Sequence, residues 1–305
     1  MTLIDQPAGQ SVTMRFTIDH TTTYRYSRPV FLEPHMIRLC PRSGADQRLH
    51  SFEVQMDPAP AGQTTILDAE NNTAVIAWFN DTTEALRVSC RAEVETLRSN
   101  PFDYLVFEHD LPVNCDGPEG VILNPYRIGT GIGDVNDAVG QFATSLLETN
   151  KRDTAALAAR LTEVIYADWK VIHREEGSPW PAEKTLAERT GSCRDVTVLF
   201  MEACRRLGAP ARFVSGYQEG DPDQTDRELH AWPEVYIPGG GWRGYDPTQG
   251  LVVADRHVAV ASSAIPIEAA PITGNFRGTG ATAMMQSHIE LSCRDVQSMQ
   301  QQQQQ

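Results

Sequence analysis

The feature that most limits the possible folds is a change in hydrophobic period partway along the chain. Apolar and polar side chains alternate at residues 15–26 and again at residues 86–95, while residues 73–79 are apolar on both sides. A period of two is typical of strands with one buried face. Turn-forming clusters at residues 57–62 and 70–72 separate these runs. We therefore expect the first hundred residues to form an antiparallel β sandwich or barrel.

Helical periodicity begins only in the second half of the chain. From about residue 153, apolar side chains recur every three or four residues, as in an amphipathic helix. The stretch 99–133 is rich in Pro, Gly, Asp and Asn and is predicted to contain the linker. The sequence thus predicts an α+β protein with a β domain at residues 1–110 and a mixed core at 111–299. Residues 300–305 are all glutamine and are predicted to be a disordered tail.

The charge and the cysteines exclude several classes of protein. Lys and Arg number 26 against 40 Asp and Glu, so the net charge is −14, which disfavours nucleic acid and anionic membranes as partners. No apolar run approaches the roughly 20 residues that span a bilayer, and the first residues lack a signal-peptide pattern. We therefore expect a cytoplasmic protein. The six cysteines are scattered without a CxxC pair, which favours free thiols over a disulfide framework or a zinc site.

The stretch GSCRDVTVLFMEACRRLGAP predicts a capped helix with a cysteine in its first turn. Ser192 and Asp195 form a capping signature, and Gly208 with Pro210 marks the end of the helix. At the start of a helix, unpaired backbone N–H groups and the helix dipole favour a thiolate and can hold an oxyanion. This position makes Cys193 the candidate nucleophile.

Each of these residues also has a structural interpretation. A cysteine is most often a small buried side chain, and we assign Cys204, three turns later beside the apolar stripe, to packing. Asp195 is interpreted as a helix cap rather than as a second catalytic acid. Only the position of Cys193 at the helix start distinguishes it from Cys204.

A second candidate residue, His230, opens a predicted strand that runs to Ile237. Glycines 239–241 form the turn, and residues 242–246 return as the next strand. With the turn centred near Gly239, Asp246 comes within about two residues of facing His230, on the same face of the hairpin. A lone histidine in a strand is usually structural, but an aspartate in this register favours a catalytic base. Pro233 inside the strand favours an edge strand or a bulge.

These three residue types fit acyl transfer from an amide. An amide carbonyl is a poor electrophile, so the attacking group must be an ionised thiol beside a base that later protonates the departing amine. A carboxylate on the other ring nitrogen fixes the tautomer and stabilises the imidazolium.

Four segments in this order resemble the bacterial transglutaminase-like cysteine enzymes: GSCRD, CRRLGAPARFVSGY, HAWPEVYIPGGGW and GYDPTQG. The segments HTTTYRYSRPV and MIRLCPR are similar to the β domain that precedes the core in that family, so the resemblance covers about residues 14–290. It implies a papain-like transglutaminase core, in which a helix bearing the cysteine packs on an antiparallel sheet bearing the histidine and the aspartate. It further implies Cys193 as nucleophile, His230 as general base and acid, and Asp246 as the orienting carboxylate.

The sequence leaves the acceptor and two other functional classes open. We expect hydrolysis of a peptide or carboxamide rather than transfer of a glutaminyl group to an amine, because cross-linking needs a site that excludes water. The alternatives are a non-catalytic peptide-binding module, with its cleft blocked by residues 219–228, and a metal site built from Cys193, His230 and Asp246. No cofactor or metal is expected, and the expected partner is a peptide or protein substrate. Trp232 is a weak candidate for contacting that substrate.

One further histidine, His257, lies in the segment DRHVAVA, which also resembles the transglutaminase-like family. We interpret it as structural.

Overall fold

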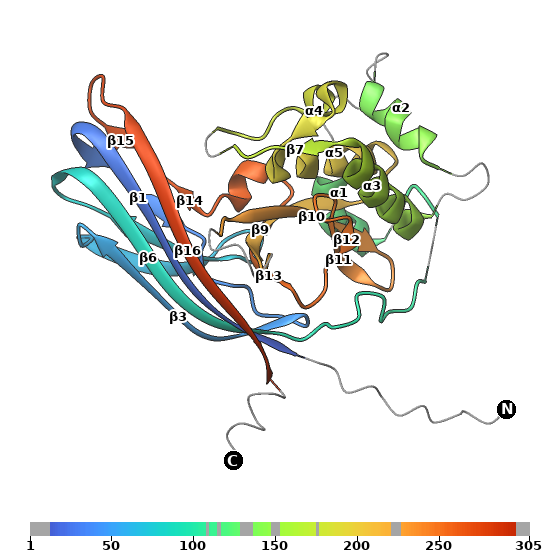
Figure 1. Ribbon diagram of the computed structural model, residues 1–305, viewed down its shortest axis with the longest axis horizontal. Coiled ribbons are helices and arrows are strands. Elements are labelled where there is room, and N and C mark those ends of the chain that lie inside the picture. The colour runs from blue at the N-terminus through green and yellow to red at the C-terminus, as the bar shows by residue number, and fades with distance from the viewer. Residues whose placement is uncertain are drawn as a thin grey trace.

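The computed structural model describes residues 13–107, 110–114, 117–128, 137–147, 153–174, 177–220 and 227–296. They form a mixed α+β structure in which nearly all strand pairs are antiparallel. Long curved strands make up one side of the molecule, and the helices with a smaller sheet make up the other (Figure 1). The predicted glutamine tail lies outside the described residues.

The β domain consists of two sheets. One contains β3 (Gln47–Asp57), β6 (Thr82–Thr96) and β1 (Met14–Leu32), with β15 (Phe276–Arg277) and β16 (Ala283–Asp295) both paired to β1. The other contains β4 (Gly62–Leu67), β5 (Thr73–Trp78), β2 (His35–Ile37) and β14 (Ile272–Thr273). Apolar side chains from both sheets share one buried cluster that includes Val30, Leu86, Ile37 and Val75. The predicted antiparallel sandwich is confirmed.

The two longest strands of this domain contribute to two hydrophobic cores. Near its beginning β1 buries Phe16 and Ile18, which lie opposite Val94 and Ala92 of β6 and pack against the core of the second domain. Further along, β1 buries Val30 inside the sandwich. Full burial of a side chain such as Phe16 contributes about 1.5–3 kcal/mol. The strands therefore fix the β domain against the second domain.

The last strand of the chain corrects the predicted domain boundaries. Residues 111–299 were expected to form the core, but β16 pairs along β1 from Met14 opposite Asp295 to Tyr26 opposite Ala283. β14 and β15 also join the sheets of the β domain. β16 is an edge strand, and most of its side chains are at least partly exposed. Its sequence therefore lacks the strong alternation that would have indicated where it pairs.

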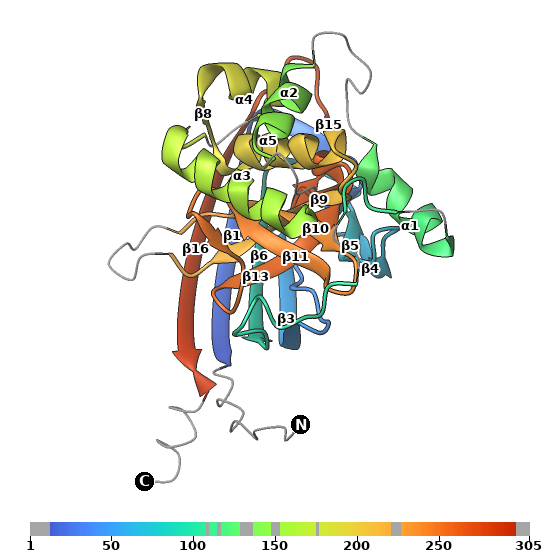
Figure 2. The ribbon, with the colours of Figure 1, turned by 90° about the vertical axis from the view of Figure 1, so that its right-hand side faces the viewer.

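The second domain is a five-stranded antiparallel sheet with helices packed on it. The sheet order is β12 (Leu251–Val252), β11 (Gly241–Asp246), β10 (His230–Ile237), β9 (Ala211–Gln218) and β13 (His257–Ser263). The helices are α1 (Pro118–Arg127), α2 (Ala138–Ser145), α3 (Thr154–Asp168), α4 (Ala182–Glu188) and α5 (Cys193–Arg206), with the short helix η1 (Pro266–Ala269). A short parallel pair, β7 (Lys170–Val171) and β8 (Thr190–Gly191), precedes α5. α5 packs mainly on β10 and β9 and contacts α2, α3 and α4 (Figure 2).

Pro233 was expected to mark an edge strand or a bulge, but β10 lies inside the sheet between β9 and β11, and its pairing with both strands has no register shift. Pro233 pairs with Phe213 on β9, whereas regular pairing with β11 begins only at Glu234. The proline thus lies just beyond the end of that ladder and can be accommodated in an interior strand. No described helix combines the length and apolar character that crossing a membrane requires.

Candidate active site

The start of α5 is held by an extensively bonded aspartate. The carboxylate of Asp195 accepts hydrogen bonds from the backbone N–H and the hydroxyl of Ser192, both at 2.8 Å. Arg174 and the backbone N–H of Trp180 also donate to it. Asp195 is fully buried. The prediction that it caps the helix is confirmed, and its bonds fix the backbone on either side of Cys193.

Cys193 is the first residue of α5 and is half-buried. Its side chain lies close enough to His230 to contribute to the raised pKa of that histidine. Because the first backbone N–H groups of a helix have no partner within the helix, they are available to stabilise an oxyanion formed next to this thiol. The thiol thus lies between a histidine and a set of hydrogen-bond donors.

His230 occupies the first position of β10 and faces Asp246 at the end of β11. The β10–β11 register pairs Glu234 with Gly244, and its continuation aligns Asp246 with Trp232, two residues from His230 on the same face. The Nε2 atom of His230 lies 2.8 Å from Oδ2 of Asp246. The structure therefore brings together the three residues predicted as a triad, in the predicted hairpin geometry.

Asp246 is an anion enclosed by donors. Its Oδ2 atom bonds both His230 and His257, and its Oδ1 atom accepts from the backbone N–H and hydroxyl of Thr248 and from the N–H of Gln249. Burial raises the pKa of this carboxyl, but the two histidines and their hydrogen bonds outweigh it and hold the pKa well below its usual value. Asp246 remains ionised over the whole working range of pH.

The charge on Asp246 decides the protonation state of His230. Burial opposes the imidazolium, but the charge and hydrogen bond of Asp246, with a smaller contribution from Cys193, raise the pKa of His230 to about 10. At neutral pH His230 is therefore an imidazolium beside the side chain of Cys193, and an imidazolium can give its proton to a leaving group.

The sequence analysis missed the part that His257 plays in this site. Its Nε2 atom lies 2.9 Å from Oδ2 of Asp246, the same oxygen that His230 contacts. β9 lies between the two histidine-bearing strands, and its residues Gly216 and Gln218 pair with His230 and His257 respectively. Both histidines thus share one face. In the sequence, His230 and His257 each begin a strand. This pattern indicates that they lie close together only when both strands are known to flank β9.

Trp232 does not line an open cleft. Its side chain is 1% exposed and packs with Val214 and Ala259. The indole stacks on the ring of His230 with centroids 6.1 Å apart. Gly216 makes room for it, because a Cβ there would come within 2.6 Å of the indole. Trp232 therefore packs against one face of the His230 ring and offers no surface to substrate.

Three of these residues could hold a metal ion. The ligand atoms of His230, Asp246 and His257 lie within 4.8 Å of one another. This set contains His257 in place of Cys193, so it differs from the metal site considered from the sequence. The same nitrogen and oxygen atoms already hydrogen-bond one another, and a metal would have to displace both hydrogen bonds.

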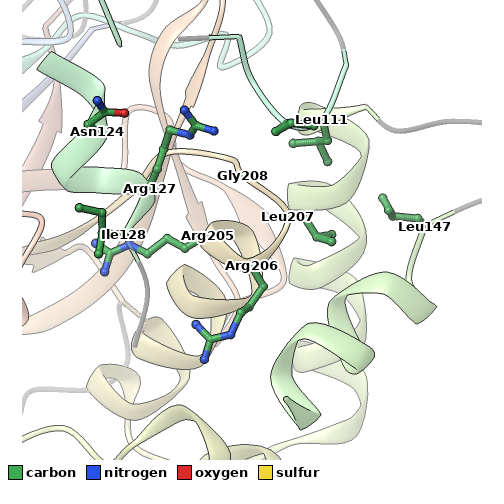
Figure 3. A pocket seen from close by; sticks show the side chains of 10 residues that line it. Leu111, Asn124, Arg127, Ile128, Leu147, Arg205, Arg206, Leu207 and Gly208 are labelled. Carbon is green, nitrogen blue, oxygen red and sulfur yellow. The ribbon is translucent and has the colours of Figure 1, made fainter. Parts of the chain in front are cut away.

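A cavity lies far from this site. It has a volume of about 640 Å³ and surrounds the C-terminal end of α5 and the residues that follow (Figure 3). The guanidinium of Arg205 donates to the carbonyls of Ala211 and Ala264, and Arg206 pairs with Asp137 and Glu202. These two charges are satisfied internally. Cys193 lies at the opposite end of the helix, about 20 Å away along its axis.

The predictions for the cysteines and for the acidic loop have different outcomes. Cys40, Cys90, Cys193, Cys204 and Cys293 are free, as predicted, and Cys115 lies outside the described residues. Residues 221–226 of the acidic loop also lie outside them. The predicted blocking of the cleft by that loop stays a prediction.

Two regions of the chain match known protein families. Residues 16–95 match the bacterial transglutaminase-like N-terminal region, and residues 140–247 match the transglutaminase-like superfamily. The second match contains Cys193, His230 and Asp246. The chain belongs to the transglutaminase-like superfamily. Within this transglutaminase-like protein, the β sandwich is the N-terminal region of the bacterial members, completed here by strands from the end of the chain.

Some similar proteins match most of this transglutaminase-like chain, and others match only a short part of it. An uncharacterized protein of Mycobacterium tuberculosis is 27% identical over 278 residues, which cover 87% of this chain and 88% of that protein. The protein-glutamine gamma-glutamyltransferase of Pseudomonas aeruginosa is 36% identical over 67 residues, covering 20% of this chain and 10% of that protein. The crystal structure of a proposed cysteine protease from Cytophaga hutchinsonii has a TM-score of 0.72 and 23% identity, covering 93% of this chain and 92% of that chain. This last similarity shows that the two share a fold.

Proposed function

We propose that this protein catalyses cysteine-dependent acyl transfer from a peptide or carboxamide substrate, with water as the preferred acceptor. The observation that carries the proposal is the chain of contacts from Cys193, in the first turn of α5, to His230 and on to the buried carboxylate of Asp246. The net charge of −14 supports peptide or protein partners rather than nucleic acid or membranes. A cytoplasmic location is part of the same proposal.

The reaction proceeds through a thioester. The Cys193 thiolate attacks the carbonyl carbon, and the resulting oxyanion is stabilised by backbone N–H groups at the start of α5. His230 gives its proton to the departing amine or ammonia as the C–N bond breaks, which leaves the acyl group on sulfur and the imidazole neutral. The neutral imidazole then takes a proton from water, whose oxygen attacks the thioester. The acid is released and the thiolate–imidazolium pair is restored.

Two observations bear on the choice of acceptor. The half-buried Cys193 and the His230 side chain, which is 14% exposed, are both within reach of water, and water is present at high concentration. Transfer to an amine is the second candidate, supported by the similarity over 67 residues to the Pseudomonas aeruginosa glutamyltransferase. The two reactions share every step up to the thioester.

The test is to incubate the wild type and Cys193→Ala with a blocked glutaminyl peptide and an unstructured protein, in ¹⁸O-water, with and without a fluorescent primary amine. Hydrolysis incorporates ¹⁸O into a new carboxylate and releases ammonia or a peptide fragment. Transfer gives the fluorescent amide instead. A hydroxylamine-sensitive mass increase on Cys193 detects the thioester directly. If the wild type gives neither product nor adduct while still binding peptide, the protein is a binding module and the proposal fails.

A further inference from the structure

Asp246 holds more partners than the acyl-transfer steps require. Those steps need Asp246 only to orient His230 and to stabilise its imidazolium, yet Oδ2 also bonds His257 at 2.9 Å. His257 does not contact the thiol in any described interaction, and its side chain is 1% exposed. Its ring also packs against Trp232, with centroids 5.1 Å apart, but its hydrogen bond within the site goes to Asp246.

The surroundings of His257 define its protonation state. Nε2 faces Asp246, whereas Nδ1 is buried and has no hydrogen-bond partner among the described residues. A proton on Nδ1 would be buried without an acceptor, in the vicinity of the imidazolium of His230, and this is unfavourable. Asp246, His230 and Asp255 are the charged groups that bear on this ring. The form that fits is neutral, with its proton on Nε2, and it donates to Asp246.

This donor restricts the rotation of the Asp246 carboxylate. Thr248 and Gln249 hold Oδ1, and His257 holds Oδ2 as a second partner beside His230. Without His257, Oδ2 would have only His230 as a partner among these contacts, and the carboxylate could turn with the imidazole. Displacement of a reacting pair by about 1 Å can cost about 100-fold in rate.

The strand that carries His257 is itself fixed by the β domain. β13 is an edge strand of the core sheet. The amide of Gln47 bonds both the N–H and the carbonyl of Ala259, at 2.9 and 2.8 Å. The amide of Asn72 does the same for Ser262, at 2.8 and 2.9 Å. Two side-chain amides thus take the place of a neighbouring strand along this edge.

A third contact lies just before β13, where the hydroxyl of Thr96 donates to the carbonyl of Asp255 at 2.8 Å. Thr96 is the last residue of β6 and Gln47 the first of β3. The ends of two β-domain strands therefore hold the backbone on both sides of His257.

We propose that His257 is a positioning residue that fixes the Asp246 carboxylate for His230, and that the β domain acts on the site by holding the strand that bears His257. This inference deepens the proposed function and depends on it only for its kinetic readout.

The first test needs no variant and no substrate. Long-range ¹H–¹⁵N spectra of the imidazole rings in the wild type report which nitrogen carries the proton. We expect His257 to stay neutral with its proton on Nε2 from pH 5.5 to 8, while His230 stays doubly protonated. A proton on Nδ1 of His257, or titration of His257 near pH 6.5, would overturn the inference even if the protein proves to be an enzyme.

The second test is the rate at which iodoacetamide alkylates Cys193 at pH 6, measured by peptide mass spectrometry. We expect His257→Leu to lower this rate about 10- to 30-fold, a loss typical of an outer-shell hydrogen bond. His257→Gln, which keeps an N–H donor of similar reach, should stay within about threefold of the wild type. His35→Leu is the matched control, because His35 is also a buried histidine but bonds only the carbonyl of Glu33 in the β domain.

Equal alkylation rates in the wild type, His257→Leu and His257→Gln would contradict a positioning role. If wild-type Cys193 reacts no faster than an ordinary accessible thiol, the proposed function fails instead, and the imidazole spectrum alone decides the inference. The same spectrum decides it if His257→Leu does not fold.

The role of the β domain is tested with Gln47→Met, which keeps the length of the side chain and removes both bonds to Ala259. We expect a three- to tenfold slower alkylation of Cys193, and no change for Gln55→Met on the exposed part of the same strand. In the double variant with His257→Leu, the Gln47 effect should largely disappear, because both act through the same carboxylate. Full additivity of the two effects would separate the β domain from the site.

Discussion

Cys193 and Cys204 lie three turns apart on one helix and project from nearly the same side of it, yet they have opposite surroundings. Cys204 is 0% exposed inside the main apolar cluster, where burial raises its pKa far above the usual range. Cys193 is half-buried, lies beside a charged histidine and adjoins free backbone N–H groups. The position along the helix, more than the direction of the side chain, decides the surroundings of each thiol, and these surroundings predict an inert Cys204 and a reactive Cys193.

Removing each sulfur in turn should give the largest contrast. Cys193→Ala removes the only atom that can form the thioester, so we expect turnover of an amide substrate to fall more than about 1,000-fold. Cys204→Ala should keep turnover within about threefold of the wild type. Steady-state assays of the two folded variants measure both effects. Comparable losses in the two variants would remove the distinction between the thiols.

Removing the imidazolium should bring Cys193 closer to an ordinary thiol. In His230→Gln the positive charge beside the sulfur is lost, so we expect the alkylation of Cys193 at pH 6 to fall about 100-fold. Cys204 should remain unmodified in the wild type and the variant, because reagents do not reach it. Residue-resolved mass spectrometry after a timed iodoacetamide pulse gives both rates. A Cys193 rate independent of His230 would mean that the helix start alone activates the thiol.

When each cysteine is replaced by serine, the larger loss of stability should occur at Cys204, whereas the larger loss of activity is expected at Cys193. Cys204→Ser buries a hydroxyl in an apolar cluster, and we expect it to lower the free energy of unfolding by about 1–3 kcal/mol. Cys193→Ser lies at a partly exposed helix start, and its effect should stay within about 0.5 kcal/mol. Urea denaturation followed by circular dichroism measures both. A larger effect at position 193 would contradict the assignment of Cys204 to packing.

The smallest expected difference concerns how the free energy of unfolding changes at alkaline pH. The folded pKa of Cys204 is raised, so its contribution to stability is complete below its unfolded pKa of about 8.5 and is lost as pH rises above that value. By pH 10 this loss amounts to about 1–2 kcal/mol.

Cys204→Ala should therefore lose less stability than the wild type between pH 8 and 10 in urea titrations. His230, whose pKa is raised to about 10, also loses its stabilising contribution in this range, but it does so in both proteins. The idea fails if Cys204→Ala and the wild type show the same pH dependence.

Local sequence determined the parts of the site that depend on neighbours in the chain. Ser192 and Asp195 are three residues apart, so a single turn of helix brings them together and places Cys193 at the helix start. His230 and Asp246 are joined by one tight glycine turn, which sets the register of their strands. Alternation in β1 and β6 was enough to predict the sandwich, because one face of each strand must be buried.

Only the tertiary structure decided the parts that depend on distant strands. β16 joins β1 from the far end of the chain, and His257 reaches Asp246 because β13 and β10 flank the same strand. The amide of Gln47 reaches β13 across the domain boundary. In the sequence Trp232 shares a strand face with the polar residues His230 and Glu234, but in the structure it is enclosed. Such pairings are chosen by the total burial and hydrogen bonding of the assembled sheets, and many partners are locally equivalent before the chain is folded.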